Sequence, residues 1–168
     1  EIPLIVEEYR QAAVNAKKAG IMAISLGGYY AHRIASMEKR YKACVAWGAI
    51  WDYYDTWKKR IDSAYKTELS VPGHHITWIL NTKTVEEALE KLDPFRLDGV
   101  VQKMRCPFLL THGADDKQQP MHYARSLFNA VGSKDKTFKI FTVKEGGSQH
   151  CQRDNLSIGT TYIFDWLQ

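Results

Sequence analysis

The sequence has no long apolar run and few cysteines. Its apolar stretches at residues 21–26 and 43–50 are far shorter than the roughly 18 residues that a membrane span needs. Cysteine occurs only three times, an odd number, and Cys44 and Cys106 adjoin apolar runs in which buried free thiols are common. This pattern argues against the disulfide framework of a secreted protein. We therefore expect a soluble, cytoplasmic protein that makes no contact with a membrane.

The sequence also lacks a block of charge of one sign. The net charge is +4, and the basic clusters Lys17-Lys18, Lys39-Arg40 and Lys58–Arg60 stand close to acidic residues. A nucleic-acid surface would gather its basic residues into a patch, so we expect no nucleic-acid partner. With 45% hydrophobic and 25% charged residues, the composition is that of a soluble globular domain.

Apolar periodicity divides most of the chain into alternating helices and strands. Helical spacing in residues 4–18 ends before Gly20, and the short apolar runs 21–24 and 42–47 are typical of buried strands that flank a helix over 29–40. The pattern continues with strands at 107–111 and 137–141, a helix at 121–131 and a last helix that ends near Trp166. This order predicts an α/β fold with a mainly parallel sheet covered by helices on both faces.

A segment in the middle of the chain has a different character. Residues 51–97 are rich in aromatic side chains and in short helical pieces, with a capping box at Thr84 and Glu87 and a helix stop at Asp93-Pro94. We therefore expect three parts. Residues 1–50 form the first part of the core, residues 51–97 form an inserted helical cap, and residues 98–168 form the rest of the core.

The predicted sheet has only four strands. Such a sheet leaves an apolar edge with unpaired backbone groups, which soluble proteins normally pair or cover. Residues 1–5 also show neither an initiator Met nor the layout of a signal peptide. We expect that the chain begins inside a longer protein, and that a preceding amino-terminal segment or a partner chain completes the sheet. A homodimer is one such arrangement.

Ser25 lies where the first strand turns into a helix. Ala23 and Gly27 are small, which lets the incoming strand and the outgoing helix approach each other, as in a nucleophile elbow. Such a sharp turn exposes the serine hydroxyl above the sheet. It also points the N–H of Leu26 to where an oxyanion would form.

A serine hydroxyl needs a base and an orienting acid, which should follow in the order Asp, His. Asp116 follows a predicted strand with the spacing from Gly113 and Pro120 that this acid requires, whereas Asp115 does not have that spacing. His150 lies on a glycine-rich loop between the last strand and the last helix. Each motif alone is ambiguous, but their order and their places at strand ends favour a catalytic triad.

Other candidate residues have plainer roles. The adjacent His74-His75 point in different directions and have no carboxylate or thiol at ligand spacing, so we expect no metal, and nothing indicates a cofactor. His112 is expected to be a structural hydrogen-bonding residue, and Cys151 to be a packing residue. Asp154 either caps or pairs near the last helix or positions the histidine loop.

Four stretches around these motifs resemble one known family. Residues 25–31, residues 42–48 together with 51–53, residues 106–113 and residues 146–154 are similar to the fungal polyketide-shortening hydrolases of pigment biosynthesis and, more distantly, to 2,6-dihydroxypseudooxynicotine hydrolase. The resemblance runs from about Gly20 to the end. It implies the carboxyl-terminal part of an α/β-hydrolase fold, which an amino-terminal helical domain and the first strands precede.

The resemblance also implies a function. It is hydrolysis of a carbon–carbon bond beside a ketone, in a polyketide-like or aromatic diketone small molecule. Trp51 and Tyr54 could line the pocket for such a planar substrate, and Tyr29 either faces the site or packs in the core. Two alternatives remain open: a carboxylesterase or lactonase with the same triad, and a noncatalytic ligand-binding relative.

Overall fold

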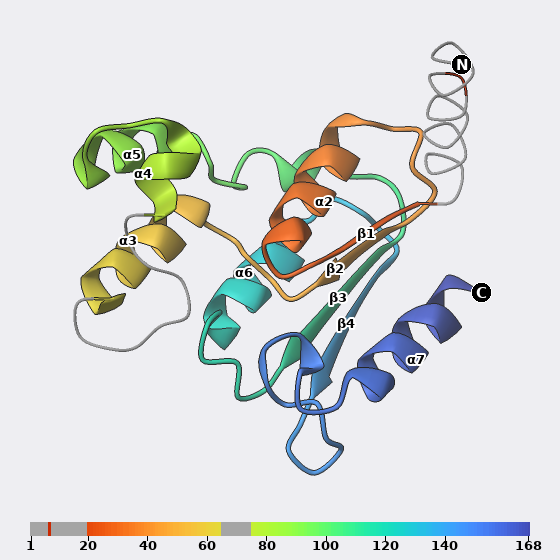
Figure 1. Ribbon diagram of the computed structural model, residues 1–168. Helices are drawn as coiled ribbons and strands as arrows, with labels where there is room; N and C mark the ends of the chain where they lie inside the picture. Colours follow the sequence, from red (N-terminus) through yellow and green to blue (C-terminus); the bar gives the residue numbers. More distant parts are fainter. Residues whose placement is uncertain (1–6, 8–19, 65–74) are drawn as a thin grey trace. The chain divides into compact units, whose positions relative to one another are not determined.

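The computed structural model describes residue 7, residues 20–64 and residues 75–168 (Figure 1). The helix expected over residues 4–18 therefore lies outside the described residues, apart from Glu7. By its internal contacts the chain divides into two compact units. Unit 1 comprises residues 1–50 and 98–168, and unit 2 comprises Trp51–Leu97. Each unit is described in turn.

Unit 1 is built on a parallel sheet of four strands, which confirms the predicted fold class. The strands are paired in chain order, and β2 and β3 are buried along their whole length because they occupy the centre. Their bounds are β1, Ile21–Ile24; β2, Cys44–Trp47; β3, Phe108–Gly113; and β4, Lys136–Phe141. The register places Ile24 level with Trp47 and Thr111, so the carboxyl ends of neighbouring strands meet at one edge.

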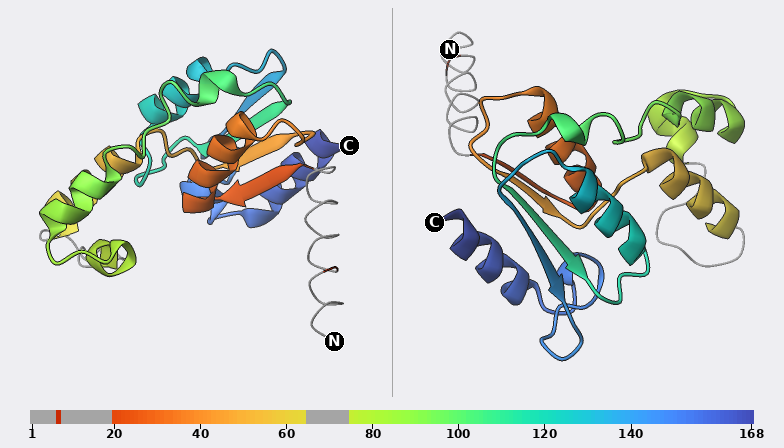
Figure 2. Two further views of the ribbon diagram at one scale, coloured as in Figure 1. Left: turned by 90° about the horizontal axis from the view of Figure 1, so that it is seen from above. Right: turned by 180° about the vertical axis from the view of Figure 1, so that it is seen from behind.

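Helices cover both faces of this sheet. Helices α2 (Leu26–Met37) and α6 (Met121–Ala130) lie on one face, and α7 (Leu156–Leu167) lies on the other (Figures 1 and 2). Two short 3-10 helices, η1 (Val101–Lys103) and η2 (His150–Gln152), belong to the connections. On the α7 side, Val45, Trp47, Leu109, Cys151 and Ile163 form one buried apolar cluster.

The bounds of the second helix differ from the prediction. It begins at Leu26 rather than at residue 29 and ends at Met37 rather than at residue 40. The turn is completed at Ser25, so Gly27 and Gly28, which precede the predicted start, lie inside the helix. The extended conformation of Glu38 ends the helix, since a residue with that backbone cannot continue it.

The edge formed by β1 and α2 is apolar and exposed. Met22 and Ile24 of β1 are 43% and 48% exposed, although strand residues of this kind are normally buried. Four apolar residues of α2 at helical spacing are also exposed: Leu26, Tyr30, Ile34 and Met37. We call these six residues the β1–α2 face. Met22 and Ile24 are level with Val45 and Trp47, so their side chains point to the α7 side of the sheet, and the exposed residues of α2 lie on its other side.

The described residues of unit 2, 51–64 and 75–97, are mainly helical. Its helices are α3 (Tyr53–Ala64), α4 (His75–Leu80) and α5 (Val85–Leu92). The predicted capping box is present, because the Thr84 hydroxyl accepts a hydrogen bond from the Glu87 N–H at 3.2 Å. The Glu87 carboxylate in turn accepts from the N–H of Lys83, one residue before the cap. Helix α5 ends just before Asp93, as expected.

The two ends of unit 2 are joined to each other. Asp52 and Arg96 form an antiparallel β-bridge, and their side chains form an ion pair of 2.8 Å. Unit 2 therefore leaves and re-enters the core sequence at neighbouring points. In the described part of the chain, no helix is both long and apolar enough to cross a membrane.

Candidate active site

Ser25 stands at the carboxyl end of β1 in a strained backbone conformation. Its φ is 54° and its ψ is −117°, a region that non-glycine residues seldom occupy and that clusters at functional sites. The Ser25 N–H donates to the carbonyl of Trp47 at 2.8 Å, which continues the ladder with β2. A Cβ added to Gly27 would lie 3.0 Å from the Cβ of Ala23, so the turn requires two small residues, as predicted.

The hydroxyl of Ser25 is directed at the candidate base. Although Ser25 occupies the N-cap position of α2, its side chain makes no capping hydrogen bond. Instead its Oγ lies 2.8 Å from Nε2 of His150. A helix cap normally uses such a hydroxyl to satisfy the first backbone N–H groups. The Ser25 side chain therefore caps none of the first backbone N–H groups of α2, among which is the N–H of Leu26.

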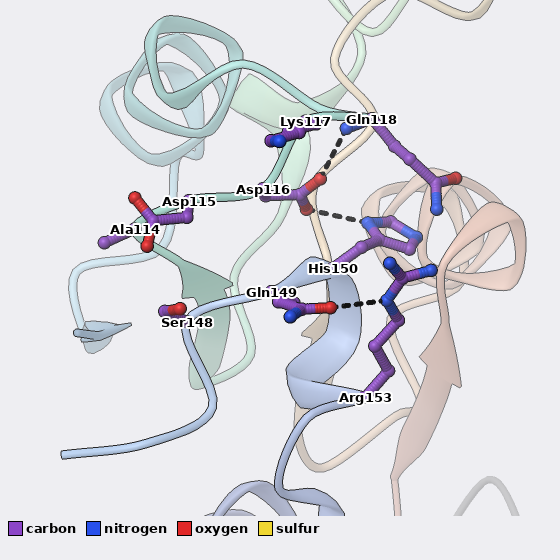
Figure 3. A pocket seen from close by; sticks show the side chains of 9 residues that line it. All are labelled: Ala114, Asp115, Asp116, Lys117, Gln118, Ser148, Gln149, His150 and Arg153. Carbon is purple, nitrogen blue, oxygen red and sulfur yellow. Dashed lines mark hydrogen bonds and ion pairs between the residues drawn. The ribbon is translucent and has the colours of Figure 1, made fainter. Parts of the chain in front are cut away.

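Asp116 is held by the loop that follows β3. Its Oδ1 accepts hydrogen bonds from the N–H groups of Gln118 and Gln119, at 2.8 and 2.9 Å. Its Oδ2 lies 2.7 Å from Nδ1 of His150 (Figure 3). Burial alone would raise the pKa of Asp116, but the hydrogen bond from His150 and the N–H of Gln119 hold that pKa below its usual range. The carboxylate is therefore charged at neutral pH.

The loop between β4 and α7 brings His150 between these two groups. The carboxylate of Asp154 accepts hydrogen bonds from the N–H groups of Ser148 and Gln149, at 3.0 and 3.1 Å. The carbonyl of Ser148 in turn accepts from the N–H of Asp115 at 2.9 Å. Asp154 thus positions the histidine loop, which was the second of the two roles considered from the sequence. The hydrogen bond between Asp115 and Ser148 joins the histidine loop directly to the loop that carries Asp116.

A buried hydrogen bond between two side chains also supports the histidine loop. The indole N–H of Trp47 donates to Oε1 of Gln152 at 2.6 Å, and both residues are buried. Sequence reasoning missed Gln152, since a glutamine after a histidine carries no recognisable signal. The ring of Trp47 lies in the core of unit 1.

Cys151 is a packing residue, as expected. Its Sγ donates to the carbonyl of Trp47 at 3.3 Å, and a Cβ added to Gly48 would lie 2.8 Å from that sulfur. Burial raises the pKa of the Cys151 thiol to about 12. A protonated thiol is a poor nucleophile, so this group does not compete with Ser25.

His112 lies near the candidate acid. Its Nδ1 is 3.9 Å from Oδ2 of Asp116, which is too long for a hydrogen bond between these two atoms, so the hydrogen-bonding role expected for His112 stays a prediction. The side chain is buried, and burial lowers the pKa of His112, against an opposing effect of Asp116. A neutral imidazole therefore fills the space behind the Asp116 carboxylate.

The predicted substrate-binding residues lie in different places. Tyr29 is fully buried, with its ring edge-on to those of Tyr30 and His32, which favours the packing role. Tyr54 lies in unit 2, where the guanidinium of Arg96 stands 4.7 Å from the centre of its ring. Trp51 is partly buried and begins unit 2. Contact of Trp51 or Tyr54 with a substrate stays a prediction.

A pocket of about 600 Å³ opens beside His150 (Figure 3). Its walls come from the acid loop, residues 114–118, and from the histidine loop, residues 148–150 and Arg153. Among residues 20–64 and 75–168, no group of three or more histidine, cysteine, aspartate or glutamate side chains could hold a metal ion.

This sheet, with an elbow serine after β1, an acid after β3 and a histidine after β4, defines an α/β-hydrolase fold. Solved structures agree. The chain is similar to the crystal structure of 2,6-dihydroxy-pseudo-oxynicotine hydrolase, with 26% identity and a TM-score of 0.71 over 96% of this chain and 45% of that one. The Pyrococcus furiosus esterase Pf2001, at 14% identity and a TM-score of 0.60 over 88% of this chain and 52% of that one, shares the fold.

Within this fold class, the chain belongs to the prolyl oligopeptidase family, whose model matches residues 5–168. It is 24% identical to hydrolase LUC6 from Fusarium and 28% identical to 2,6-dihydropseudooxynicotine hydrolase from Paenarthrobacter nicotinovorans. Each comparison covers 92% of this chain, but only 43% and 39% of those relatives. The predicted resemblance and the class of hydrolase are confirmed at the level of the family. The chain spans about two fifths of the relatives' length.

Proposed function

We propose that this chain carries the catalytic triad of a serine hydrolase. One observation carries the proposal: Ser25 Oγ, both ring nitrogens of His150 and Asp116 Oδ2 form a continuous row joined at 2.8 and 2.7 Å. In this proposal Ser25 is the nucleophile, His150 the base and Asp116 the acid that orients the imidazole. The strained backbone of Ser25 and its place at the start of α2 support the same assignment.

Each group has one step in the proposed mechanism. His150 takes the proton of Ser25 through Nε2 while Oγ attacks the substrate carbonyl carbon, and Asp116 stabilises the resulting imidazolium through Nδ1. The oxyanion of the tetrahedral adduct receives the N–H of Leu26. When the adduct collapses, His150 returns the proton to the leaving group. Water, with His150 again as base, then releases the acyl group from Ser25.

The proposed reaction is cleavage of a carbon–carbon bond beside a ketone, in a polyketide-like or aromatic diketone. The likeness to a hydrolase named for 2,6-dihydropseudooxynicotine supports this class. A carbon leaving group departs only if its electron pair is delocalised into a second carbonyl or an aromatic ring, so a large planar substrate is required. Trp51 and Tyr54 are proposed to contact that planar part.

Covalent labelling tests the triad, and substrate comparison tests the reaction class. A fluorophosphonate should label the complete protein, whereas Ser25→Ala should abolish labelling. Undiminished labelling of that variant would remove Ser25 from the mechanism. Next, kcat/KM is compared for an aromatic 1,3-diketone and for short-chain esters and lactones. Better turnover of the esters would favour an esterase, and labelling without turnover of either would favour a ligand-binding relative.

We also propose that another polypeptide segment covers the β1–α2 face. The exposed apolar side chains of that face support this, as does the greater length of the relatives. A preceding segment of the same protein fits best, because it would extend the sheet next to β1. A partner chain or a second copy would serve the same physical purpose. Such a segment would also supply the second oxyanion donor.

A further inference from the structure

We propose that Arg153 binds the anionic oxygen of the leaving group, that is, the enolate released from a 1,3-dicarbonyl substrate. This proposal rests on the proposed function, because it concerns the carbon–carbon bond that breaks beside the carbonyl carbon attacked by Ser25. Arg153 follows the 3-10 helix η2, and its N–H donates to the carbonyl of His150 at 3.2 Å. The side chains of His150 and Arg153 both line the pocket.

The guanidinium of Arg153 is oriented by a hydrogen bond, and no carboxylate of the described residues neutralises its charge. Its Nε donates to Oε1 of Gln149 at 2.7 Å, which fixes the plane of the group. Figure 3 shows the guanidinium extending toward the ring of His150, whereas Lys117 lies on the opposite side of Asp116. The neighbouring carboxylate of Asp154 is occupied by two backbone N–H groups. In the described part of the chain, no carboxylate forms an ion pair with Arg153.

The reaction proposed at Ser25, which contacts the pocket residue His150, calls for such a group. When Ser25 Oγ has added to one carbonyl, the carbon–carbon bond breaks and its electron pair moves onto the second carbonyl oxygen, giving an enolate. A guanidinium is always charged and planar, and can present two donors to one oxygen or to a pair of oxygens. His150 then delivers its proton to the enolate carbon, which gives a neutral ketone and an acyl group on Ser25. Water releases that acyl group as a carboxylic acid.

Cleavage of an alkyl ester at the same site does not need this second cationic group. Its leaving oxygen is bonded directly to the attacked carbon and receives its proton from His150, so no second anionic oxygen forms. Arg153 should therefore matter more for diketones than for esters. This difference separates a leaving-group site from a residue that merely supports the histidine loop, since loss of loop support would slow both reactions equally.

The test compares Arg153→Gln, Arg153→Lys and the control Lys144→Gln, an exposed cation outside the pocket lining, in the complete protein. The substrates are 1-phenylbutane-1,3-dione and an alkyl ester with the same acyl group. We expect Arg153→Gln to lower the ratio of the two kcat/KM values, diketone over ester, by about 10²-fold, the usual effect of losing one donor to a developing oxyanion. Arg153→Lys should restore part of it, and Lys144→Gln should leave the ratio unchanged. An equal loss for both substrates, or no loss, would overturn the proposal.

A binding measurement decides the question even if diketones are not cleaved. In Ser25→Ala no adduct forms, so bound 1-phenylbutane-1,3-dione can be titrated by its enolate absorbance. We expect the bound diketone to ionise at lower pH than the free compound, and Ser25→Ala/Arg153→Gln to lose this shift. An unchanged shift in the double variant would exclude Arg153. Fluorophosphonate labelling of Arg153→Gln that matches the parent shows separately that the triad is intact.

Discussion

The carboxylate of Asp116 divides its two oxygens between different partners. Oδ1 is bound by two backbone N–H groups of its own loop, and Oδ2 receives only Nδ1 of His150. The loop therefore sets the direction of the carboxylate before the imidazole binds it. Asp115, the neighbouring acid, contacts the histidine loop through its backbone and keeps its side chain exposed.

This division predicts unequal effects at the two aspartates. Asp116→Asn places an amide opposite Nδ1 and favours the wrong tautomer of His150, so kcat should fall by about 10⁴, as in other triads. Asp115→Asn, the matched control, keeps the backbone bond to Ser148 and should change kcat only slightly. Steady-state kinetics on both variants give the comparison. Equal damage at both positions would mean that Asp116 is not the orienting acid.

His32 provides a prediction about stability and pH. It is fully buried on α2, and burial lowers its pKa from 6.5 to about 3, against a smaller opposing effect of the Ile50 backbone. The unfolded chain therefore binds a proton at His32 before the folded chain does. The contribution of the neutral imidazole to the free energy of unfolding is fully present above pH 6.5 and is lost as the pH falls toward 3. The loss is on the order of a few kcal/mol.

Replacement of the His32 imidazole tests the predicted direction of this pH dependence of stability. His32→Phe fills similar space and cannot titrate, so its unfolding free energy should fall less than that of the parent between pH 7 and pH 4. Denaturant unfolding at a series of pH values measures the difference between the two proteins, in which the other titrating groups cancel. Parallel curves for parent and variant would show that His32 is not the group responsible.

At the same scale, the sequence predicted the three residues of the candidate triad but not what holds them. Ser25, Asp116 and His150 each stand in a motif whose spacing reflects a local turn. The bonds from Trp47 to Gln152 and from Asp154 to the histidine loop depend on how distant elements pack, so the sequence left Asp154 with two roles. The exposure of Tyr29 likewise depends on packing around α2, which helical spacing alone does not determine.

Among the structural elements, the end of β3 and the histidine loop approach each other closely. A Cβ added to Gly113 would lie 2.2 and 2.4 Å from the carbonyl oxygens of Ser148 and Gln149. Both neighbours are backbone atoms, so they cannot move without shifting the loop that carries His150. Position 113 therefore requires glycine for a steric reason that does not depend on its backbone angles.

Gly113→Ala should move the histidine loop away from Asp116 and slow fluorophosphonate labelling of Ser25 by about 10²-fold, since a displacement of about 1 Å can have that effect. It should also lower the thermal midpoint. The control is Gly99→Ala, which has a positive φ of 76° but no atom within 4 Å of the added Cβ. That variant should lose some stability and label normally. Normal labelling of Gly113→Ala would show that the loop tolerates the displacement.

The elements themselves were largely predictable. The order of strands and helices in unit 1 follows from short apolar runs separated by helical periods, and the parallel sheet is confirmed. The start of α2 was misplaced because two glycines in sequence normally indicate a turn. Here Gly28 lies in the helix, where a Cβ would come within 2.7 Å of the carbonyl oxygen of Gly48. Close packing against β2, which the sequence does not reveal, outweighs the low helix propensity of glycine.

For the whole molecule, the β1–α2 face leads to a prediction about completeness. If another segment covers it, Met22→Lys/Ile24→Lys should strongly lower the thermal midpoint of the complete protein, because two charges would be buried without partners. Val143→Lys, at an exposed loop position, should have little effect. Residues 1–168 expressed alone should aggregate or be inactive. A soluble, active monomer of this length, or a harmless double substitution, would contradict the proposed cover.

The bridge between Asp52 and Arg96 also affects the order of folding. Strands β2 and β3 pair side by side, yet all of unit 2 lies between them in the chain, so their pairing must close a loop of about 60 residues. If unit 2 folds first, the bridge shortens the effective loop by about two doublings, which lowers the entropic cost of closure by roughly 1 kcal/mol. Formation of the central strand pair should therefore be fastest when the inserted helices have already formed.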